Sequence, residues 1–227
     1  MATIEETIKY YSEKEYNHLS EKAYDILQEL IVTMILKPGK LYSEAELSSM
    51  LEIGRTPVRE AIKKLEDTML LEIVPRSGVK ISEIRLEDFY LQMEVRKLVE
   101  RLIVQRATKF STNSEKVRFK ELSEEWKTAT INKDSDLAVR VDDEFHRLMI
   151  DCARNPYAKK AIAPFHLQER RLFYIEYDSG TEYIKAINDA HSRLMFAISQ
   201  GKEENAALIF DEMMENIELL GTKWLKF

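Results

Sequence analysis

An aspartate and a histidine four residues apart carry the spacing that most directly suggests chemistry. Asp142 and His146 would lie one turn apart on the same face of a helix, where a carboxylate oxygen and an imidazole nitrogen can bind one cation. His191, on a later predicted helix, is a candidate third ligand. Three protein ligands can hold one Zn²⁺, Ni²⁺ or Mn²⁺ ion while water or a small-molecule carboxylate completes its coordination. The alternative interpretation is a hydrogen-bonded Asp142–His146 pair that binds no metal.

A second set of residues has the types and spacing needed to contact DNA. Arg55, Arg59 and Lys63 recur every four residues, so a helix would present all three on one side. Arginine reaches guanine edges or phosphates, and the hydroxyl of Thr56 can hold a phosphate. A helix of this kind fits the major groove. The alternative is that these charges form the solvated face of a structural helix.

The elements around this basic helix indicate a winged helix-turn-helix. Ser43 and Glu46 form a capping box before a short helix, and Pro57 suits the first turn of the next one. We expect the helix before them to stop ahead of Pro38, which disfavours helical geometry in the residue before it. The predicted elements are helices at residues 19–36, 44–51 and 55–65 and a β-hairpin of strands 71–74 and 79–81.

The turn of the predicted hairpin is basic. Its residues include Arg76 and Gly78, and such a wing can contact the DNA backbone or the minor groove. The chain as a whole has a net charge of −6, so any DNA-binding surface must be local. Within residues 55–80 basic side chains outnumber acidic ones. The predicted DNA-binding residues are Arg55, Thr56, Arg59, Lys63, Arg76 and Gly78.

The rest of the chain reads as a set of helices. Glycine is absent between Gly78 and Gly180, and the sequence there is rich in Leu, Glu, Lys, Arg and Ala. Such helices can enclose a ligand pocket in their core. The fold class is therefore mainly α, with an N-terminal arm or added helix at 1–18, a winged helix-turn-helix at 19–82 and an all-helical domain at 83–227. The predicted helices of the last domain span 86–109, 113–132, 135–153, 157–177, 180–199 and 203–224.

Composition excludes several classes of protein. The 227 residues are 44% hydrophobic and 33% charged, as in an ordinary globular chain. No apolar run approaches the roughly 18 to 20 residues of a membrane span, and no signal peptide is recognisable, so we expect a cytoplasmic protein without a membrane partner. The single cysteine, Cys152, excludes an intrachain disulfide and a cysteine zinc cluster, and the six glycines form no phosphate-binding loop.

The first region resembles the DNA-binding domain of the GntR family of bacterial transcription regulators. The resemblance lies in Leu36-Lys37-Pro38-Gly39, in Arg55-Thr56-Pro57-Val58-Arg59-Glu60-Ala61-Ile62 and in Pro75-Arg76-Ser77-Gly78. Two positions depart from the family pattern. Gly54 stands where Ser or Thr usually caps the recognition helix, and Ala45 stands where some members carry arginine. Glycine is a tolerable N-cap, so we expect an intact fold.

The second region resembles the FCD ligand-binding domain of the FadR-type branch of that family. The matching pieces are Arg96 with Glu100, the segment Asp142-Asp143-Glu144-Phe145-His146, Asn155 and Ala190-His191. This resemblance implies a metal site with Asp142, His146 and His191, and a further His at a position that is Met213 here. A thioether is a poor partner for a zinc-like ion, so the ligand set is incomplete.

The predicted effector-binding residues are Arg96, Glu100 and Met213. Arg96 could form a bidentate pair with an acidic metabolite. A salt bridge from Arg96 to Glu100, four residues further on, is the alternative.

Together these patterns predict a homodimeric regulator, a repressor, that binds a palindromic operator in double-stranded DNA. Two recognition helices related by a two-fold axis read more base pairs than one. A small metabolite, a carboxylate, would bind the helical domain and change operator affinity, with or without one divalent metal ion per chain. Two alternatives are a DNA-binding protein whose helical domain only dimerises, and a metal-dependent hydrolase with Glu144 or Glu100 as base. An enzyme would leave the winged helix unexplained, so we predict that the protein is not one.

Overall fold

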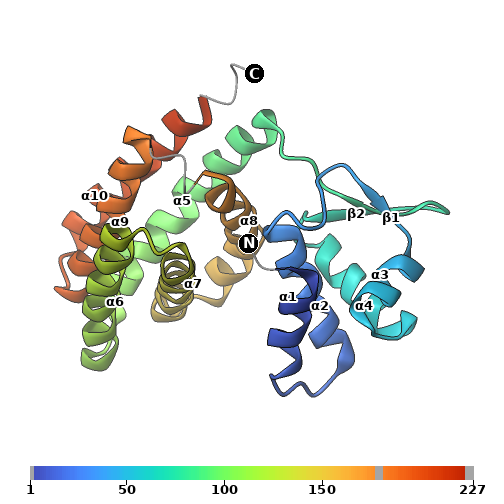
Figure 1. The fold of residues 1–227 in the computed structure, drawn as a ribbon. Coiled ribbons are helices and arrows are strands. Elements are labelled where there is room, and N and C mark those ends of the chain that lie inside the picture. The colour runs from blue at the N-terminus through green and yellow to red at the C-terminus, as the bar shows by residue number, and fades with distance from the viewer. Residues whose placement is uncertain (1–2, 177–180, 223–227) are drawn as a thin grey trace. The chain divides into compact units, whose positions relative to one another are not determined.

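The computed structural model describes residues 3–176 and 181–222 and divides into two compact units. The first unit comprises Met1–Arg85 with Ala163–Ile175, and the second comprises Leu86–Ile162 with Glu176–Phe227. Figure 1 shows the two units, with the helices and the strands β1 and β2 labelled. The chain is mainly α, as predicted, with one small antiparallel sheet in the first unit.

The first unit contains the predicted winged helix-turn-helix. Helix α3 spans Glu44–Leu51 and α4 spans Arg55–Glu66, and the hairpin pairs β2 (Leu71–Val74) with β3 (Gly78–Ile81). The capping box at the start of α3 is present, because Ser43 accepts from the Glu46 N–H and Glu46 accepts from the Ser43 N–H. The apolar faces of α2 and α4 pack together, and with the sheet they bury one core.

Helix α2 is shorter than the sequence predicted. It spans Leu19–Val32, whereas the prediction ran to residue 36 on the expectation that Pro38 would stop it. Met34 instead adopts a left-handed conformation, with φ of 61°, and the Leu36 N–H donates to the carbonyl of Leu30. This bond closes the helix end before the proline is reached, and Leu36 folds back into the core.

Residues 1–18 include a helix that packs on the core of the first unit. Helix α1 spans Ile4–Ser12 and begins with a capping box between Thr3 and Glu6. Ile4, Ile8 and Tyr11 lie against the core of the first unit. Of the two possibilities that the sequence left open, an arm or an added helix, the structure contains the helix.

The first part of the chain belongs to the first unit as far as Arg85, close to the predicted division between residues 82 and 83. Glu83 pairs with Lys80 of β3, and the Ser82 N–H donates to the Leu70 carbonyl, which hold residues 82–85 to the first unit. The predicted domain 83–227 also included residues 163–175, but this part of α8 (Pro156–Glu176) belongs to the first unit. There Arg170 pairs with Glu29 of α2.

The second unit is a bundle of long helices, shown from green to red in Figure 1. Helix α9 packs against both α6 and α10, and α5 packs against α10 and α7. Predicted helix ends agree with the observed ones to within two residues, although predicted ends at 177, 180 and 224 lie outside the described residues. The helices are α5 (Leu86–Phe110), α6 (Asn113–Asn132), α7 (Ser135–Cys152), α9 (Glu182–Ser199) and α10 (Glu203–Thr222). Within the described residues, no helix is long and apolar enough to cross a membrane.

A two-residue strand that the sequence did not reveal fixes the position of the hairpin. Strand β1 (Leu41–Tyr42) pairs with β3, so the sheet has the order β1-β3-β2. Gly78 begins β3 with φ of +125°, and a Cβ atom at this position would overlap the backbone carbonyl of Tyr42. Only glycine therefore allows the wing to lie so close to the segment that enters α3.

We predict that Gly78→Ala lowers the free energy of unfolding by about 2 kcal/mol or more, because the new methyl group meets rigid backbone at a strained φ. Urea denaturation of the full chain measures the change. Gly54→Ser is the matched control, since a Cβ at Gly54 would lie 3.8 Å from the Pro57 ring, at ordinary contact distance. Equal stability of Gly78→Ala and the wild type would contradict the role given to this glycine.

Candidate DNA interface and candidate metal centre

Helix α4 is amphipathic, and this orients its basic side chains. Its inner face buries Val58, Ala61, Ile62 and Leu65 in the core of the first unit. The predicted DNA-binding residues on the opposite side, Arg55, Thr56, Arg59 and Lys63, are all exposed. Gly54 is the N-cap residue of α4 and has no side chain that could accept a hydrogen bond from the first N–H groups of the helix. The exposed face therefore offers cations together with the positive end of a helix, which suits phosphate contact.

The hairpin tip supplies one further exposed cation. Arg76 lies in the turn with φ of 64° and is exposed. Gly78, predicted as a DNA-binding residue, is half-buried against Tyr42 and has the structural role described above. Arg76 is thus the wing side chain that is placed to reach DNA.

An ion pair that the sequence did not indicate lies on the exposed side of α4. Glu44, the first residue of α3, binds Arg59 through both carboxylate oxygens, and the shortest distance is 2.6 Å between Arg59 Nη2 and Glu44 Oε2. The Arg59 guanidinium holds the pKa of Glu44 below its usual range, so the pair stays ionised at neutral pH. Because the two residues are 15 apart in sequence and lie on different helices, no local spacing indicates the pair.

The second unit brings the three predicted metal ligands together. Asp142 and His146 lie on α7 and His191 lies on α9, and all three are buried. The Nε2 atoms of His146 and His191 each lie 3.5 Å from Asp142 Oδ1, and one ligand atom from each residue lies within 4.8 Å of the others. Residues 45 positions apart in sequence thus converge on one point of the bundle interior.

The surroundings of His191 fix its ring. The Nδ1 atom lies 2.9 Å from the Ile187 carbonyl, which can only accept a hydrogen bond, so the neutral ring carries its proton on Nδ1. The Nε2 lone pair then faces Asp142. The indole of Trp126 stacks on the imidazole at 4.9 Å and donates its own N–H to the Asn188 carbonyl one turn away. A carbonyl partner of this kind is the usual outer support of a metal-bound histidine.

Comparison with known proteins fits this two-part architecture. Residues 92–216, more than half of the chain, match the FCD domain, and residues 19–81 match the bacterial regulatory proteins of the gntR family. The chain belongs to the GntR family. Both resemblances seen in the sequence are thereby confirmed. GntR-family regulators bind DNA and effector molecules, and this protein is a DNA-binding transcriptional regulator rather than an enzyme.

Two relatives and one solved structure can be aligned with most of this chain. The HTH-type transcriptional repressor RspR of Escherichia coli (strain K12) is 28% identical over 160 residues, which are 70% of each chain. The HTH-type transcriptional regulator LutR of Bacillus subtilis (strain 168) is 24% identical over 81% of this chain and 92% of its own. The structure of E. coli McbR/YncC covers 93% of this chain and 100% of its own with a TM-score of 0.79 at 18% identity, which shows a common fold.

The residues predicted to bind the effector of this GntR-family regulator are buried. Arg96 and Glu100 on α5 form the salt bridge that was the alternative interpretation, with Arg96 Nε 3.1 Å from Glu100 Oε1 and Nη2 3.3 Å from Oε2. Met213 is buried on α10, the helix that packs against α9. Effector binding by these three residues stays a prediction.

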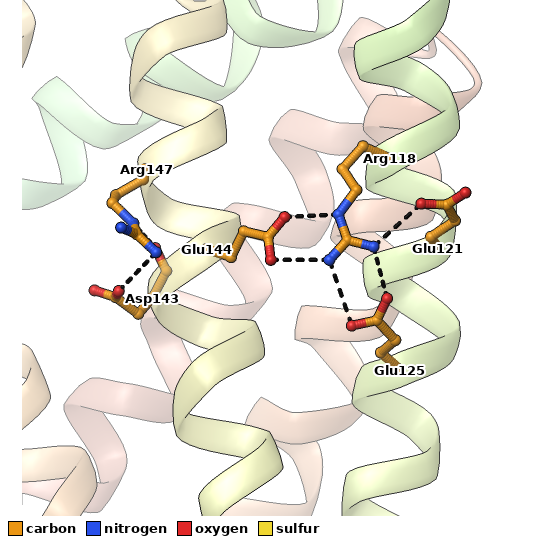
Figure 2. A network of polar contacts seen from close by, with 6 residues as sticks. All are labelled: Arg118, Glu121, Glu125, Asp143, Glu144 and Arg147. Atoms are coloured by element: carbon orange, nitrogen blue, oxygen red, sulfur yellow. Dashed lines mark hydrogen bonds and ion pairs between the residues drawn. The ribbon is translucent and has the colours of Figure 1, made fainter. Parts of the chain in front are cut away.

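Both carboxylates proposed as the base of a hydrolase are engaged in ion pairs. Glu100 binds Arg96, and Glu144 binds Arg118 of α6 at 2.6 and 2.8 Å (Figure 2). Figure 2 also shows Glu121 and Glu125 of α6 on the same guanidinium, which therefore joins α6 to α7. Arg118 lowers the pKa of Glu144. A carboxylate held in this way is a poor general base near neutral pH.

We predict that Lys63→Ala weakens binding to all duplex sequences together and lowers the slope of log affinity against log salt by about one, because one phosphate contact is lost. Fluorescence anisotropy on a mixed-sequence duplex at several NaCl concentrations measures the slope. Lys120→Ala, which removes an exposed cation from α6 in the other unit, should leave the slope unchanged. An unchanged slope for Lys63→Ala would show that this face of α4 does not contact the DNA backbone.

Proposed function

We propose that this GntR-family protein is a homodimeric repressor of a palindromic operator. In this proposal Asp142, His146 and His191 hold one divalent transition metal ion per chain, and a small carboxylate that completes the metal coordination acts as the effector. The observation that carries the proposal is the convergence of one carboxylate and two imidazoles inside the helical domain, with ligand atoms within 4.8 Å of one another.

The distances support a shared cation. In a tetrahedral site with metal–ligand bonds of about 2.0 to 2.1 Å, neighbouring ligand atoms lie about 3.3 Å apart. The two His–Asp distances of 3.5 Å are close to that value and longer than most direct N–H···O hydrogen bonds. Oxygen and imidazole ligands suit Zn²⁺, Ni²⁺ or Mn²⁺.

Met213 supports a role for an external ligand. The resemblance to FCD domains implies a histidine at this position, and a thioether does not replace it for such ions. Three protein ligands leave at least one coordination position for water or for a carboxylate oxygen. A metabolite with a carboxylate can therefore bind the ion directly and bring its own charge to balance the metal.

Control of DNA binding follows from differential affinity. An effector changes operator affinity only if it binds one conformation of the protein better than another. We propose that the carboxylate favours the conformation that releases DNA. The relative RspR is described as a transcriptional repressor, which supports the proposed role as a repressor. A helical domain that only dimerises would not need two histidines and an aspartate buried at one point.

An apolar stripe on α5 supports the homodimer. Leu91, Val95, Leu98 and Leu102 follow one another at intervals of four, three and four residues and are 58%, 44%, 75% and 43% exposed. This is the spacing of a helix–helix seam. A two-fold axis across α5 would pair the stripe with itself, as a symmetric dimer requires. A dimer also presents two recognition helices, which a palindrome needs.

We predict that protein purified without chelator or tag carries about one transition metal ion per chain, and that His146→Ala and His191→Ala lose it. Elemental analysis by mass spectrometry measures the content after growth with Zn²⁺, Ni²⁺ or Mn²⁺. His18→Ala is the control, because His18 is exposed at the start of α2. Metal-free wild-type protein under every supplement would contradict the metal centre and leave a carboxylate to be bound by protein groups alone.

We predict that Leu98→Glu converts the dimer into a monomer at micromolar concentration, because two carboxylates would be buried near the two-fold axis. Analytical ultracentrifugation gives the mass. The matched control is Leu208→Glu, which places the same charge at a leucine of α10 that is 66% exposed and lies outside the stripe. A Leu98→Glu protein that remains dimeric would assign the dimer interface to another surface.

A further inference from the structure

The Glu44–Arg59 pair places a carboxylate beside the exposed basic side chains Arg59, Arg55 and Lys63 of α4. The Glu44 carboxylate lies close enough to Arg55 and Lys63, as well as Arg59, for all three to lower its pKa. On a surface that contacts phosphates, a carboxylate weakens the general attraction for DNA. A carboxylate at this position is therefore expected to contribute to DNA binding in another way.

Glu44 is held on a rigid support. It is the first residue of α3, directly after the Ser43 and Glu46 capping box, and α3 packs against α4. The carboxylate binds Arg59 side-on, taking Nε at 3.1 and 2.9 Å and Nη2 at 2.6 Å. Contacts at two nitrogens fix the plane of the guanidinium as well as its position.

The opposite edge of the guanidinium points away from Glu44. A guanidinium has five N–H groups, and the side-on contact leaves the outer edge, formed by Nη1 and the second N–H of Nη2, facing outward. The Arg59 side chain is 59% exposed, so a ligand can reach this edge. Two parallel donors in that arrangement match the O6 and N7 acceptors of guanine in the major groove.

We propose that Glu44 is a positioning residue for base recognition: it holds Arg59 in the orientation in which the outer edge of the guanidinium reads one guanine of the operator. The inference rests on α4 being the helix that enters the major groove. A fixed arginine loses less conformational entropy when it binds a base than a mobile one, and it is less able to turn toward a phosphate or a different base. Glu44 thus weakens attraction to DNA in general and sharpens the choice of sequence.

Selection from random DNA tests this inference without a known operator. Full-length wild type, Glu44→Gln, Arg59→Ala and Glu60→Gln are each used to enrich a duplex pool randomised over about three helical turns. Glu60→Gln is the matched control. Glu60 is exposed and carries the same charge one residue from Arg59, but the carboxylate that forms the ion pair with Arg59 belongs to Glu44. Affinities for the best wild-type sequence and for its single-base changes are then measured at one salt concentration.

We expect the wild type to select a guanine at one position of each half-site. In Glu44→Gln, discrimination at that position falls about tenfold while affinity for unrelated duplex rises, because a carboxylate has left the DNA-facing surface. Arg59→Ala loses the same position, and adding Glu44→Gln to Arg59→Ala causes no further loss of discrimination. Glu60→Gln keeps the wild-type preference. Loss at one position with a gain in general affinity is a pattern that simple unfolding does not produce.

Two results would overturn the inference. Full wild-type discrimination in Glu44→Gln, or an equal loss at all positions, would show that Glu44 does not orient a base-reading arginine, although α4 would remain the reading helix. Failure of the wild type to enrich any sequence would instead remove the base-reading role of α4 itself, and with it the role of Glu44. Thermal denaturation of each variant shows whether the fold is retained.

Discussion

The helical domain depends on keeping a carboxylate and two imidazoles together in an apolar interior. Burial of a charged group is unfavourable by several kcal/mol unless another charge or a metal ion compensates it. Each histidine places its Nε2 atom 3.5 Å from the same Asp142 oxygen, and in the proposed site a divalent ion bound by all three residues would compensate the charge of the buried carboxylate. The arrangement holds only if α7 and α9 keep their relative positions. Packing of α6 against both helices, with Trp126 stacked on His191, provides that constraint.

The DNA-binding domain has a different requirement: a small apolar core must hold charged side chains in defined positions on the surface. Val58, Ala61, Ile62 and Leu65 anchor α4, and the rest of its surface is available for DNA. The wing is positioned by backbone contact, since β3 approaches Tyr42 at Gly78 too closely for any side chain. The predicted DNA-binding cations of this domain can therefore be exposed and still well placed, because apolar packing and backbone geometry determine the positions of the helix and turn that carry them.

Local signals predicted most of the fold. Capping residues, prolines and helical periodicity gave α3, α4 and the helices of the second unit to within two residues, and the hairpin followed from its turn. The features that the sequence did not reveal depend on tertiary contacts: the two-residue strand β1, the left-handed turn at Met34 and the assignment of residues 163–175 to the first unit. The site shows the same division. The i, i+4 spacing predicted that Asp142 and His146 lie together. The sequence did not reveal the role of Glu44, because its partner Arg59 lies on another helix.

The position of the candidate metal centre bears on how an effector could act within the helical domain. Two ligands come from α7 and one from α9, so an ion and its external ligand would join helices that are far apart in sequence. His191 is held by its own helix through Ile187 and by the ring of Trp126 from α6, and cannot reorient alone. A carboxylate that moves the ion must then move α9 against α6 and α7. Because closely packed helices switch between discrete arrangements rather than deform continuously, the proposed control would need only a small shift at this site to favour one arrangement of the bundle over another.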